Sequence, residues 1–270
     1  MSIKLIAFDM DNTLLDSNKM ILKSSKAAVK RALSMGIKIV MCTGRPLAGV
    51  SEYLNELGIS GDDQYVVTYN GAIVESVAGR TITKHLINKS EYRRLVNYAD
   101  KNGIQYYSLD PDSNVYTGNH DISRVAVLQA WENHAGIFVR DPKDLPDDFT
   151  AAKFDFVGEQ EDLNIDEPVV ISDLGEQFSV IREGTVFLAV MNKRANKGTG
   201  LRSLAEHLNI LASEVMAFGD ERNDIAMFDY AGTAICMKNG TNQAKEHADY
   251  ITDSNVNDGI SKAMDKFIFE

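Results

Sequence analysis

Short apolar runs alternate with segments of helical periodicity over the first seventy residues. Residues 3–8, 37–41 and 65–68 are apolar runs too short for a helix, so each predicts a buried strand. Helices are predicted between them, over about 24–35 and 47–57, and a glycine directly follows each. Strands that alternate with helices in this way indicate right-handed crossovers and a parallel sheet.

The alternation is lost between about residues 83 and 190. One helix is predicted over 90–102, and strands are predicted over 149–157, 178–182 and 186–191. Four of the five prolines of the chain also lie in this region. We therefore expect an α+β domain here, of a different character from the segments on either side.

After residue 197 the first pattern returns. Helices are predicted over 199–208 and 225–230, and strands over 215–218 and 233–237. The fold class predicted is α/β, with a Rossmann-like parallel-sheet core interrupted by an inserted α+β domain. The predicted boundaries place the core at 1–83 and 191–270 and the insertion at 84–190.

Composition and charge narrow the function. Apolar residues make up 44% of the 270 residues and the formal net charge is −11, so the chain can bury a core but lacks the basic surface that nucleic acids and anionic membranes require. No stretch is long and apolar enough to span a membrane, and the start does not resemble a signal peptide. Two cysteines in apolar runs predict buried thiols. We expect a cytoplasmic protein that binds neither nucleic acid nor membrane.

Polar residues follow three of the predicted core strands. Asp9 to Thr13 follows the first, Thr43-Gly44-Arg45 the second, and Gly219 to Asp224 a later one. Ligands of open parallel sheets bind outside the carboxyl ends of the strands, so we expect these three segments to meet at one edge.

The carboxylates of these segments suggest a metal site. Asp9 and Asp11 alternate along one strand and point in the same direction, and two like charges at close range need a counter-charge. Mg²⁺ prefers such oxygen ligands, and Asp220 and Asp224 are placed to complete the site. Taken without the third segment, Asp9 and Asp11 are equally well explained as turn or capping carboxylates.

Three further residues suit an anion. Thr43 and Gly44 lie at a predicted strand-to-helix turn, where a hydroxyl and free amides bind anions, although for Thr43 taken alone capping of the helix is the better explanation. Lys197 precedes a helix and would supply the cation that a phosphate site needs beside carboxylates.

Trp131, with Val127 and Leu128, is predicted to be a core residue.

These motifs, in this order, resemble those of the haloacid dehalogenase-like hydrolase superfamily. Within it, the chain is similar to the Cof-type phosphatases and most of all to the YidA-like sugar-phosphate phosphatases. The resemblance covers essentially the whole chain and makes residues 84–190 a cap domain. It rests on these segments: Asp9-x-Asp11-x-Thr13, Thr43-Gly44-Arg45-Pro46, Tyr69-Asn70-Gly71-Ala72, Asn196-Lys197-Gly198 and Gly219-Asp220 through Asp224-Ile225-Ala226-Met227. The chain departs from the family at Asn12, where glycine is usual, and we expect asparagine to tolerate the left-handed turn.

The resemblance implies a role for each residue. Asp9 would be the nucleophile that forms an aspartyl phosphate, and Asp11 the general acid and base. The site implied holds Mg²⁺ by Asp9, Asp11 and Asp220. Phosphate or substrate would be bound by Thr43, Gly44, Lys197 and Asn223. Supporting positions would be Thr13, Arg45, Asn70 and Asp224.

The function predicted is Mg²⁺-dependent hydrolysis of small phosphate monoesters, such as sugar phosphates. A phosphomutase or phosphotransferase on the same fold, and a metabolite-binding protein without turnover, are the alternatives. The partner expected is a small phosphorylated metabolite, and the oligomeric state is left open.

Overall fold

The computed structural model describes residues 2–270 and divides the chain into two compact units. Of the described residues, the first unit comprises 2–83 and 196–270, and the second comprises 84–195. An α/β unit interrupted by a mixed unit is the predicted fold class, which is thereby confirmed. The assignment of these parts as hydrolase core and cap stays a prediction.

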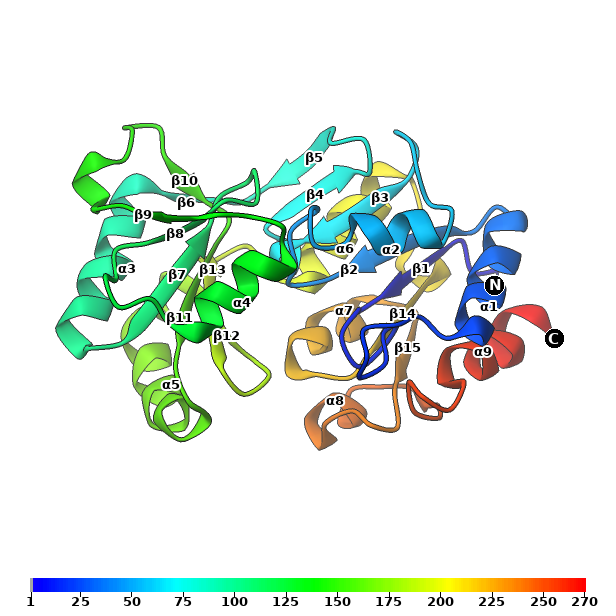
Figure 1. The fold of residues 1–270 in the computed structure, drawn as a ribbon. Helices are drawn as coiled ribbons and strands as arrows, with labels where there is room; N and C mark the ends of the chain where they lie inside the picture. The colour runs from blue at the N-terminus through cyan, green and yellow to red at the C-terminus, as the bar shows by residue number, and fades with distance from the viewer. Residues whose placement is uncertain (1) are drawn as a thin grey trace. The chain divides into compact units, whose positions relative to one another are not determined.

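The first unit is built on an eight-stranded sheet (Figure 1) with the order β16-β15-β14-β1-β2-β3-β4-β5. Its strands are β1 (Leu5–Phe8), β2 (Lys38–Cys42), β3 (Tyr65–Thr68), β4 (Ile73–Ser76), β5 (Thr81–Lys84), β14 (Val215–Gly219), β15 (Thr233–Cys236) and β16 (Tyr250–Ile251). The strands from β16 to β3 pair in parallel, and β4 turns back against β3. The apolar runs thus form strands that are buried on both faces, as runs without alternation indicate.

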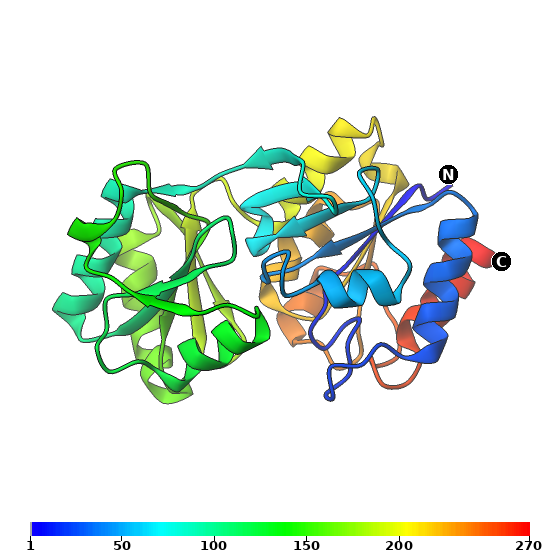
Figure 2. The ribbon, with the colours of Figure 1, turned by 45° about the horizontal axis from the view of Figure 1, so that its top comes forward.

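Helices cover both faces of this sheet. They are α1 (Lys23–Ser34), α2 (Ser51–Glu56), α6 (Lys197–His207), α7 (Ile225–Tyr230), α8 (Asn242–Glu246) and α9 (Gly259–Met264). Alternate strand residues contribute to two separate cores, since Ile6 and Phe8 pack with α1, α2 and α9 while Leu5 and Ala7 pack with α6 and α7. Figures 1 and 2 both show α1 and α9, from opposite ends of the chain, side by side.

The second unit contains a six-stranded sheet with the order β12-β13-β11-β7-β8-β9 and a small β10–β6 ladder. The strands are β6 (Ile87–Asn88), β7 (Gln105–Leu109), β8 (Val115–Thr117), β9 (Ile137–Val139), β10 (Thr150–Ala151), β11 (Lys153–Val157), β12 (Phe178–Glu183) and β13 (Phe187–Asn192), and the helices are α3 (Lys89–Asn102), α4 (Arg124–Glu132) and α5 (Gln160–Leu174). One face of the sheet packs against α3 and α5, with Phe154 and Phe156 in the core between them.

The structure overturns the expectation that Trp131 lies in the core. Its side chain is 80% exposed, and Val127 and Leu128 are also exposed. The reason is that α4 turns its smaller residues, such as Ala126 and Ala130, toward the unit.

Among residues 2–270, no helix has the length and hydropathy required to cross a bilayer. The cytoplasmic location stays a prediction.

Gly198 allows α6 to approach α7 closely. A Cβ at this position would lie 2.0 Å from the carbonyl oxygen of Ala226, which is backbone and cannot move out of the way. The backbones of α6 and α7 therefore meet where the first turn of α6 also carries Lys197. The glycine of the Asn196-Lys197-Gly198 segment is thus required by packing.

Gly198→Ala is expected to lower the free energy of unfolding by about 1–3 kcal/mol, the cost of overpacking a close contact. Gly136→Ala is the matched control, because nothing lies within 4 Å of its added Cβ, and its effect should be within about 0.5 kcal/mol. Chemical denaturation of both variants measures the difference. Equal stability of the two variants would contradict the packing role.

Candidate active site

Three neighbouring parallel strands bring the polar segments together. β1 lies between β14 and β2, with Phe8 paired to Phe218 on one side and to Met41 on the other. The chain then leaves all three strands at the same edge, and the backbone N–H of Asp9 donates to the carbonyl of Phe218 at 2.9 Å. The segments that follow these strands meet as the sequence predicts.

A buried lysine joins two of the carboxylates. Lys197 is the first residue of α6, and its side chain is fully buried. Its Nζ donates to Oδ1 of Asp9 at 2.7 Å and to Oδ1 of Asp224 at 2.6 Å. Asn196 caps the helix and fixes this turn, since its side chain accepts from the Thr199 N–H at 2.8 Å. A buried ammonium needs such partners because desolvation of an unpaired charge is very costly.

Asp9, Asp220 and Asp224 form the acidic cluster of the site. One carboxylate oxygen from each lies within 4.8 Å of the others, and all three residues are buried. If all three are ionised, Lys197 leaves a net charge of −2 in this cluster. Hard carboxylate oxygens and this charge both suit a divalent cation, so the residues present fit a metal site.

Asp224 is held by donors of the protein at both of its carboxylate oxygens. Its Oδ2 accepts from the backbone N–H groups of Asp220 and Glu221 at 2.8 and 2.9 Å, while its Oδ1 accepts from Lys197. Asp9 and Asp220 are therefore the better placed of the three to face a cation.

The protonation equilibria of the cluster reflect burial and mutual repulsion. Burial, followed by the charge of Asp224, raises the pKa of Asp9 to about 7, although Lys197 opposes the shift. Burial and the charges of Asp9 and Asp224 raise the pKa of Asp220 to about 8. Burial would lower the pKa of Lys197, but the two carboxylates outweigh this and raise it. Without a cation, Asp9 and Asp220 therefore tend to retain protons near neutral pH.

Asp11 has a different environment. Arg45 binds its carboxylate with two hydrogen bonds, from Nε at 2.9 Å and from Nη2 at 2.8 Å, and Lys19 adds a third at 2.6 Å. Burial alone would raise the pKa of Asp11, but the hydrogen bonds and charges of Arg45 and Lys19 lower it to about 2. Arg45 is thus paired with Asp11, and the carboxylate of Asp11 is ionised in this arrangement.

Thr13 and Thr43 are both buried beside the cluster. The hydroxyl of Thr13 donates to Oδ1 of Asp220 at 2.7 Å, which orients this carboxylate. Thr43 accepts at its Oγ1 from the N–H of Arg45 at 3.2 Å. The helix predicted to begin at residue 47 begins at Ser51 instead, so Thr43 and Gly44 precede a loop and not a helix N-terminus. Binding by a helix N-terminus therefore does not apply to them, and binding of phosphate by the Thr43 hydroxyl and the amides of this loop stays a prediction.

Asn70 and Asn223 contact each other across the site. The amide Nδ2 of Asn223 donates to Oδ1 of Asn70 at 3.2 Å, and the backbone N–H of Asn70 donates to the carbonyl of Thr43 at 2.8 Å. Oδ1 of Asn223 is buried and has no hydrogen-bond partner among residues 2–270. Buried polar atoms are nearly always paired, so this atom is available to a ligand or a water.

Asn12 adopts the backbone conformation expected of it. Its φ is 60°, in the left-handed region that glycine usually occupies. The side chain of Asn239, which the sequence reasoning missed, donates to the Asn12 carbonyl at 2.8 Å. The backbone N–H of Thr241 similarly donates to the carbonyl of Asp220 at 2.9 Å. Both residues follow β15, so the strand-end rule applied to a fourth strand would have found them.

Lys19 is a second residue that sequence reasoning missed. It lies at the tip of a tight turn in which its N–H donates to the carbonyl of Asp16 at 3.0 Å, and its φ is 59°. The turn returns the chain toward the strand end, which brings Lys19 to Asp11. No pattern of spacing in the sequence distinguishes it from an ordinary surface lysine.

The stability of the metal-free protein is expected to fall as pH rises from ~4 to ~8. The pKa values of Asp9 and Asp220 are raised from 3.8 to about 7 and about 8, so across this window the folded state holds protons that the unfolded state has lost. A divalent cation replaces these protons and should raise the melting temperature more at the upper end of the window than at the lower.

Thermal unfolding in chelator and in excess Mg²⁺, across this pH range, tests the expectation. Asp220→Asn should reduce the Mg²⁺-dependent increase, whereas Asp63→Asn, at an exposed carboxylate, should keep it. A cation-induced increase that is the same at every pH would contradict the electrostatic description of the cluster.

The chain has clear relatives among known proteins. Residues 6–264 match the family described as haloacid dehalogenase-like hydrolase. A protein of Bacillus subtilis named "Putative phosphatase YxeH" is 32% identical over 98% of both chains. The 5-amino-6-(5-phospho-D-ribitylamino)uracil phosphatase YcsE of the same organism is 27% identical over 97% of this chain and 94% of its own. The solved structure of the subclass IIB sugar phosphatase BT4131 superimposes with a TM-score of 0.82 at 26% identity, covering 98% of each chain.

Proposed function

The chain belongs to the haloacid dehalogenase-like hydrolases, and from this membership we propose that it is a Mg²⁺-dependent phosphatase of small phosphate monoesters, with sugar phosphates as the substrate class. The family predicted from the sequence is confirmed, and the names of the relatives support the predicted enzyme class, a phosphatase. The metal, the substrate and the intermediate are the proposed parts.

One observation carries the proposal, namely the buried contact of Lys197 with Asp9 beside Asp220. Asp9 lies at the end of a strand and can serve as a nucleophile. The ammonium of Lys197, which holds it beside Asp220, carries the positive charge that attracts a phosphate. A surface ion pair would need no such burial. The arrangement therefore favours catalysis over a purely structural role.

Asp9 is proposed to act as the nucleophile. One of its carboxylate oxygens attacks phosphorus, the bond from phosphorus to the ester oxygen breaks, and an aspartyl phosphate remains on Asp9. Lys197 holds the carboxylate in place through Oδ1. The pairing also favours the ionised form of Asp9, which the attack requires and which burial alone opposes.

Asp11 is proposed to move the protons. It gives a proton to the leaving alkoxide, and later takes one from the water that attacks phosphorus and releases phosphate. While Arg45 and Lys19 bind it, Asp11 is ionised and suited to the second step. The first step requires that Asp11 be protonated. The hydrogen bonds from Arg45 to Asp11 must therefore break or lengthen when substrate is bound.

The phosphoryl oxygens are proposed to be bound by Thr43, Gly44, Lys197 and Asn223. Thr43 has a buried hydroxyl that can donate, and Lys197 offers the positive charge. Asn223 would donate through its Nδ2, which in this structure donates to Oδ1 of Asn70 at 3.2 Å; its unpaired Oδ1 can only accept and would face a water or a hydroxyl. These donors offset part of the negative charge that otherwise repels a phosphate from the carboxylates.

Asp9, Asp220 and the backbone carbonyl of Asp11 are the residues proposed to hold Mg²⁺. When bound, the cation cancels the repulsion between Asp9 and an anionic substrate and stabilises the charge that develops in the transition state. Thr13 orients Asp220 toward this position through its hydroxyl. Asp224 is proposed to hold the ammonium of Lys197 in place. Its contact with Lys197 favours this role over direct binding of the metal.

Residues 84–190 are proposed to act as a cap that selects the substrate. The sugar phosphatase and the ribitylaminouracil phosphatase among the relatives both act on small phosphorylated metabolites, as their names state. Release of free phosphate from a panel of sugar phosphates tests the substrate class. Transfer of the phosphoryl group to a second sugar without phosphate release would instead identify a phosphotransferase.

Asp9→Asn is expected to lower kcat by several orders of magnitude, because an amide cannot attack phosphorus effectively. Asp63→Asn removes an equally charged but exposed side chain and should leave kcat unchanged. Both variants are assayed after their folding has been checked by circular dichroism. A folded Asp9→Asn enzyme with near-normal activity would refute the nucleophile.

Activity is expected to require Mg²⁺ and to be poorly supported by Ca²⁺. Ca²⁺ takes more oxygen ligands at longer distances, so Asp9 and the phosphate would be misplaced. Initial rates in chelator, with Mg²⁺ restored and with Ca²⁺ in its place, measure this dependence. Full activity in chelator would show that the proposed metal role is wrong.

A further inference from the structure

We propose that Lys153, Asp155 and Glu183, a buried charged cluster of the second unit, bind hydroxyl groups of the substrate and so select polyhydroxylated phosphate esters. Nζ of Lys153 lies 2.6 Å from Oε2 of Glu183 and 3.3 Å from Oδ1 of Asp155. The inference rests on the proposed phosphatase function and adds to it the residues that choose among substrates.

The cluster lies on the face of the six-stranded sheet that α3 and α5 do not cover. Phe154 and Phe156 of β11 point into the core beneath those helices. Side chains alternate along a strand, so Lys153 and Asp155 of the same strand point to the opposite face. There the sheet buries charged groups in place of an aromatic core.

Asp155 is the member of the cluster that points to a ligand. It is fully buried, and neither of its carboxylate oxygens accepts a hydrogen bond from a residue within 2–270. Buried acceptors are nearly always paired. With one ammonium for two carboxylates, the ionised cluster also keeps a net charge of −1. Asp155 therefore has two acceptor atoms available to donors that the chain itself does not supply.

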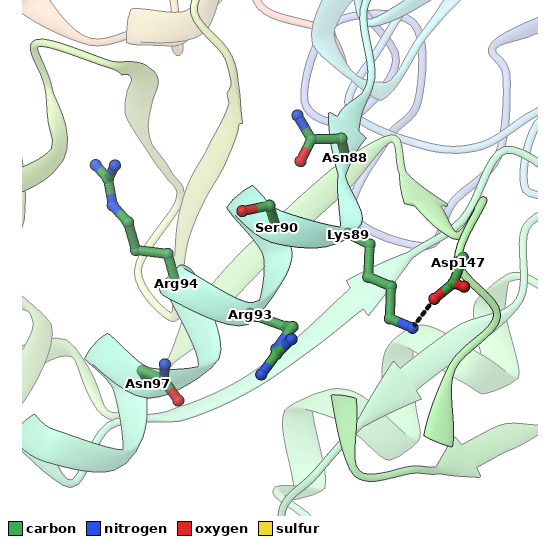
Figure 3. Close-up of a pocket in the computed structure, with 7 residues that line it drawn as sticks. All are labelled: Asn88, Lys89, Ser90, Arg93, Arg94, Asn97 and Asp147. Carbon is green, nitrogen blue, oxygen red and sulfur yellow. Dashed lines mark hydrogen bonds and ion pairs between the residues drawn. The ribbon is translucent and has the colours of Figure 1, made fainter. Parts of the chain in front are cut away.

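An ordinary ion pair of the same unit shows the contrast. In Figure 3, Nζ of Lys89 lies 3.0 Å from Oδ1 of Asp147, whose side chain is exposed to solvent. Water satisfies the remaining oxygen of such a carboxylate, so this pair needs no further partner. The burial of Asp155 removes that possibility.

Stability does not explain the presence of Asp155. Burial raises its pKa to about 6, and the charge of Glu183 adds to the shift although Lys153 opposes it. Keeping the carboxylate ionised at neutral pH therefore lowers the stability of the folded state. Buried ion pairs are in any case often replaceable by apolar residues without loss of stability. A buried charge that destabilises the fold is typical of a binding residue.

The donors and acceptors of the cluster define the class of ligand. Asp155 can only accept, and Lys153 can only donate. A hydroxyl group both donates and accepts, so neighbouring hydroxyls of one ligand can satisfy both residues. An ammonium ligand would be repelled by Lys153. The hydroxyl of Tyr107, which is paired with Asp155 across β7 and β11, adds a second donor, because burial raises its pKa and keeps it protonated.

Glu183 connects the cluster to the surface. It lies at the end of the edge strand β12, and its side chain is 14% exposed. Lys153 contacts Glu183 directly, so a hydroxyl group that approaches from this side meets the lysine and then Asp155.

The test measures the binding of two phosphate esters with the same carbon chain, sorbitol 6-phosphate and hexyl phosphate, by calorimetric titration in Mg²⁺. Every protein carries Asp9→Asn, so that hydrolysis does not affect the result. This parent is compared with the same chain carrying Asp155→Asn, which keeps the shape of the side chain and removes its charge. Asp162→Asn is the matched control, because it makes the same exchange at an exposed position of α5.

The parent should bind sorbitol 6-phosphate more tightly than hexyl phosphate. Asp155→Asn should reduce this preference at least about tenfold, since a charged acceptor is lost, and Asp162→Asn should keep it. An unchanged preference with Asp155→Asn, no preference in the parent, or an equal loss of affinity for both ligands would overturn the proposal. Phosphate release by the unsubstituted chain is assayed separately, so a chain that releases none contradicts the proposed function without altering the preference.

Denaturation of the same proteins at neutral pH excludes a structural explanation. Asp155→Asn should unfold at no lower denaturant concentration than its parent, because the contact of Lys153 with Glu183 remains and a buried charge is removed. A lower midpoint would show that Asp155 stabilises the fold, and this result would also overturn the proposal.

Discussion

The ammonium of Lys197, buried between Asp9 and Asp224, is the constraint on which the rest of the site depends. A buried charge of this kind persists only when its partners are held at close range, because breaking one contact leaves an uncompensated charge in the interior. The requirement explains why Asp224 also binds two backbone N–H groups. It explains as well why the turn that carries the lysine is capped by Asn196 and closely packed at Gly198.

The same site contains an excess of negative charge that the lysine alone does not remove. Burial and the neighbouring carboxylates raise the pKa values of Asp9 and Asp220, whereas Arg45 and Lys19 lower that of Asp11. Such different environments support the proposed division of tasks, in which Asp9 and Asp220 share a cation and Asp11 exchanges protons. All three residues are aspartates, so their different pKa values come from their surroundings: Asp11 contacts Arg45 and Lys19, whereas Asp9 and Asp220 lie in the buried cluster with Lys197.

Much of the site is predictable from the ends of the strands, and the omissions have physical causes. Parallel strands end at one edge of a sheet, so the sequence alone places Asp9, Thr43 and Asp220 together. Lys19 escapes this rule because a tight turn, and not a periodic element, brings it to the site. In the second unit, α5 was missed because it is apolar on both sides, with Leu163 buried and Ile165 exposed. Trp131 was misplaced because hydrophobicity alone does not tell which face of a helix is covered.

Rapid quench of the enzyme during turnover, followed by mass spectrometry of its peptides, tests the central claim most directly. The account predicts a peptide that carries one added phosphoryl group on Asp9, formed before phosphate is released and absent from the Asp9→Asn variant. Bond cleavage between phosphorus and the ester oxygen requires this intermediate if Asp9 attacks. Turnover with no phosphorylated peptide, or with the phosphoryl group on another residue, would contradict the account.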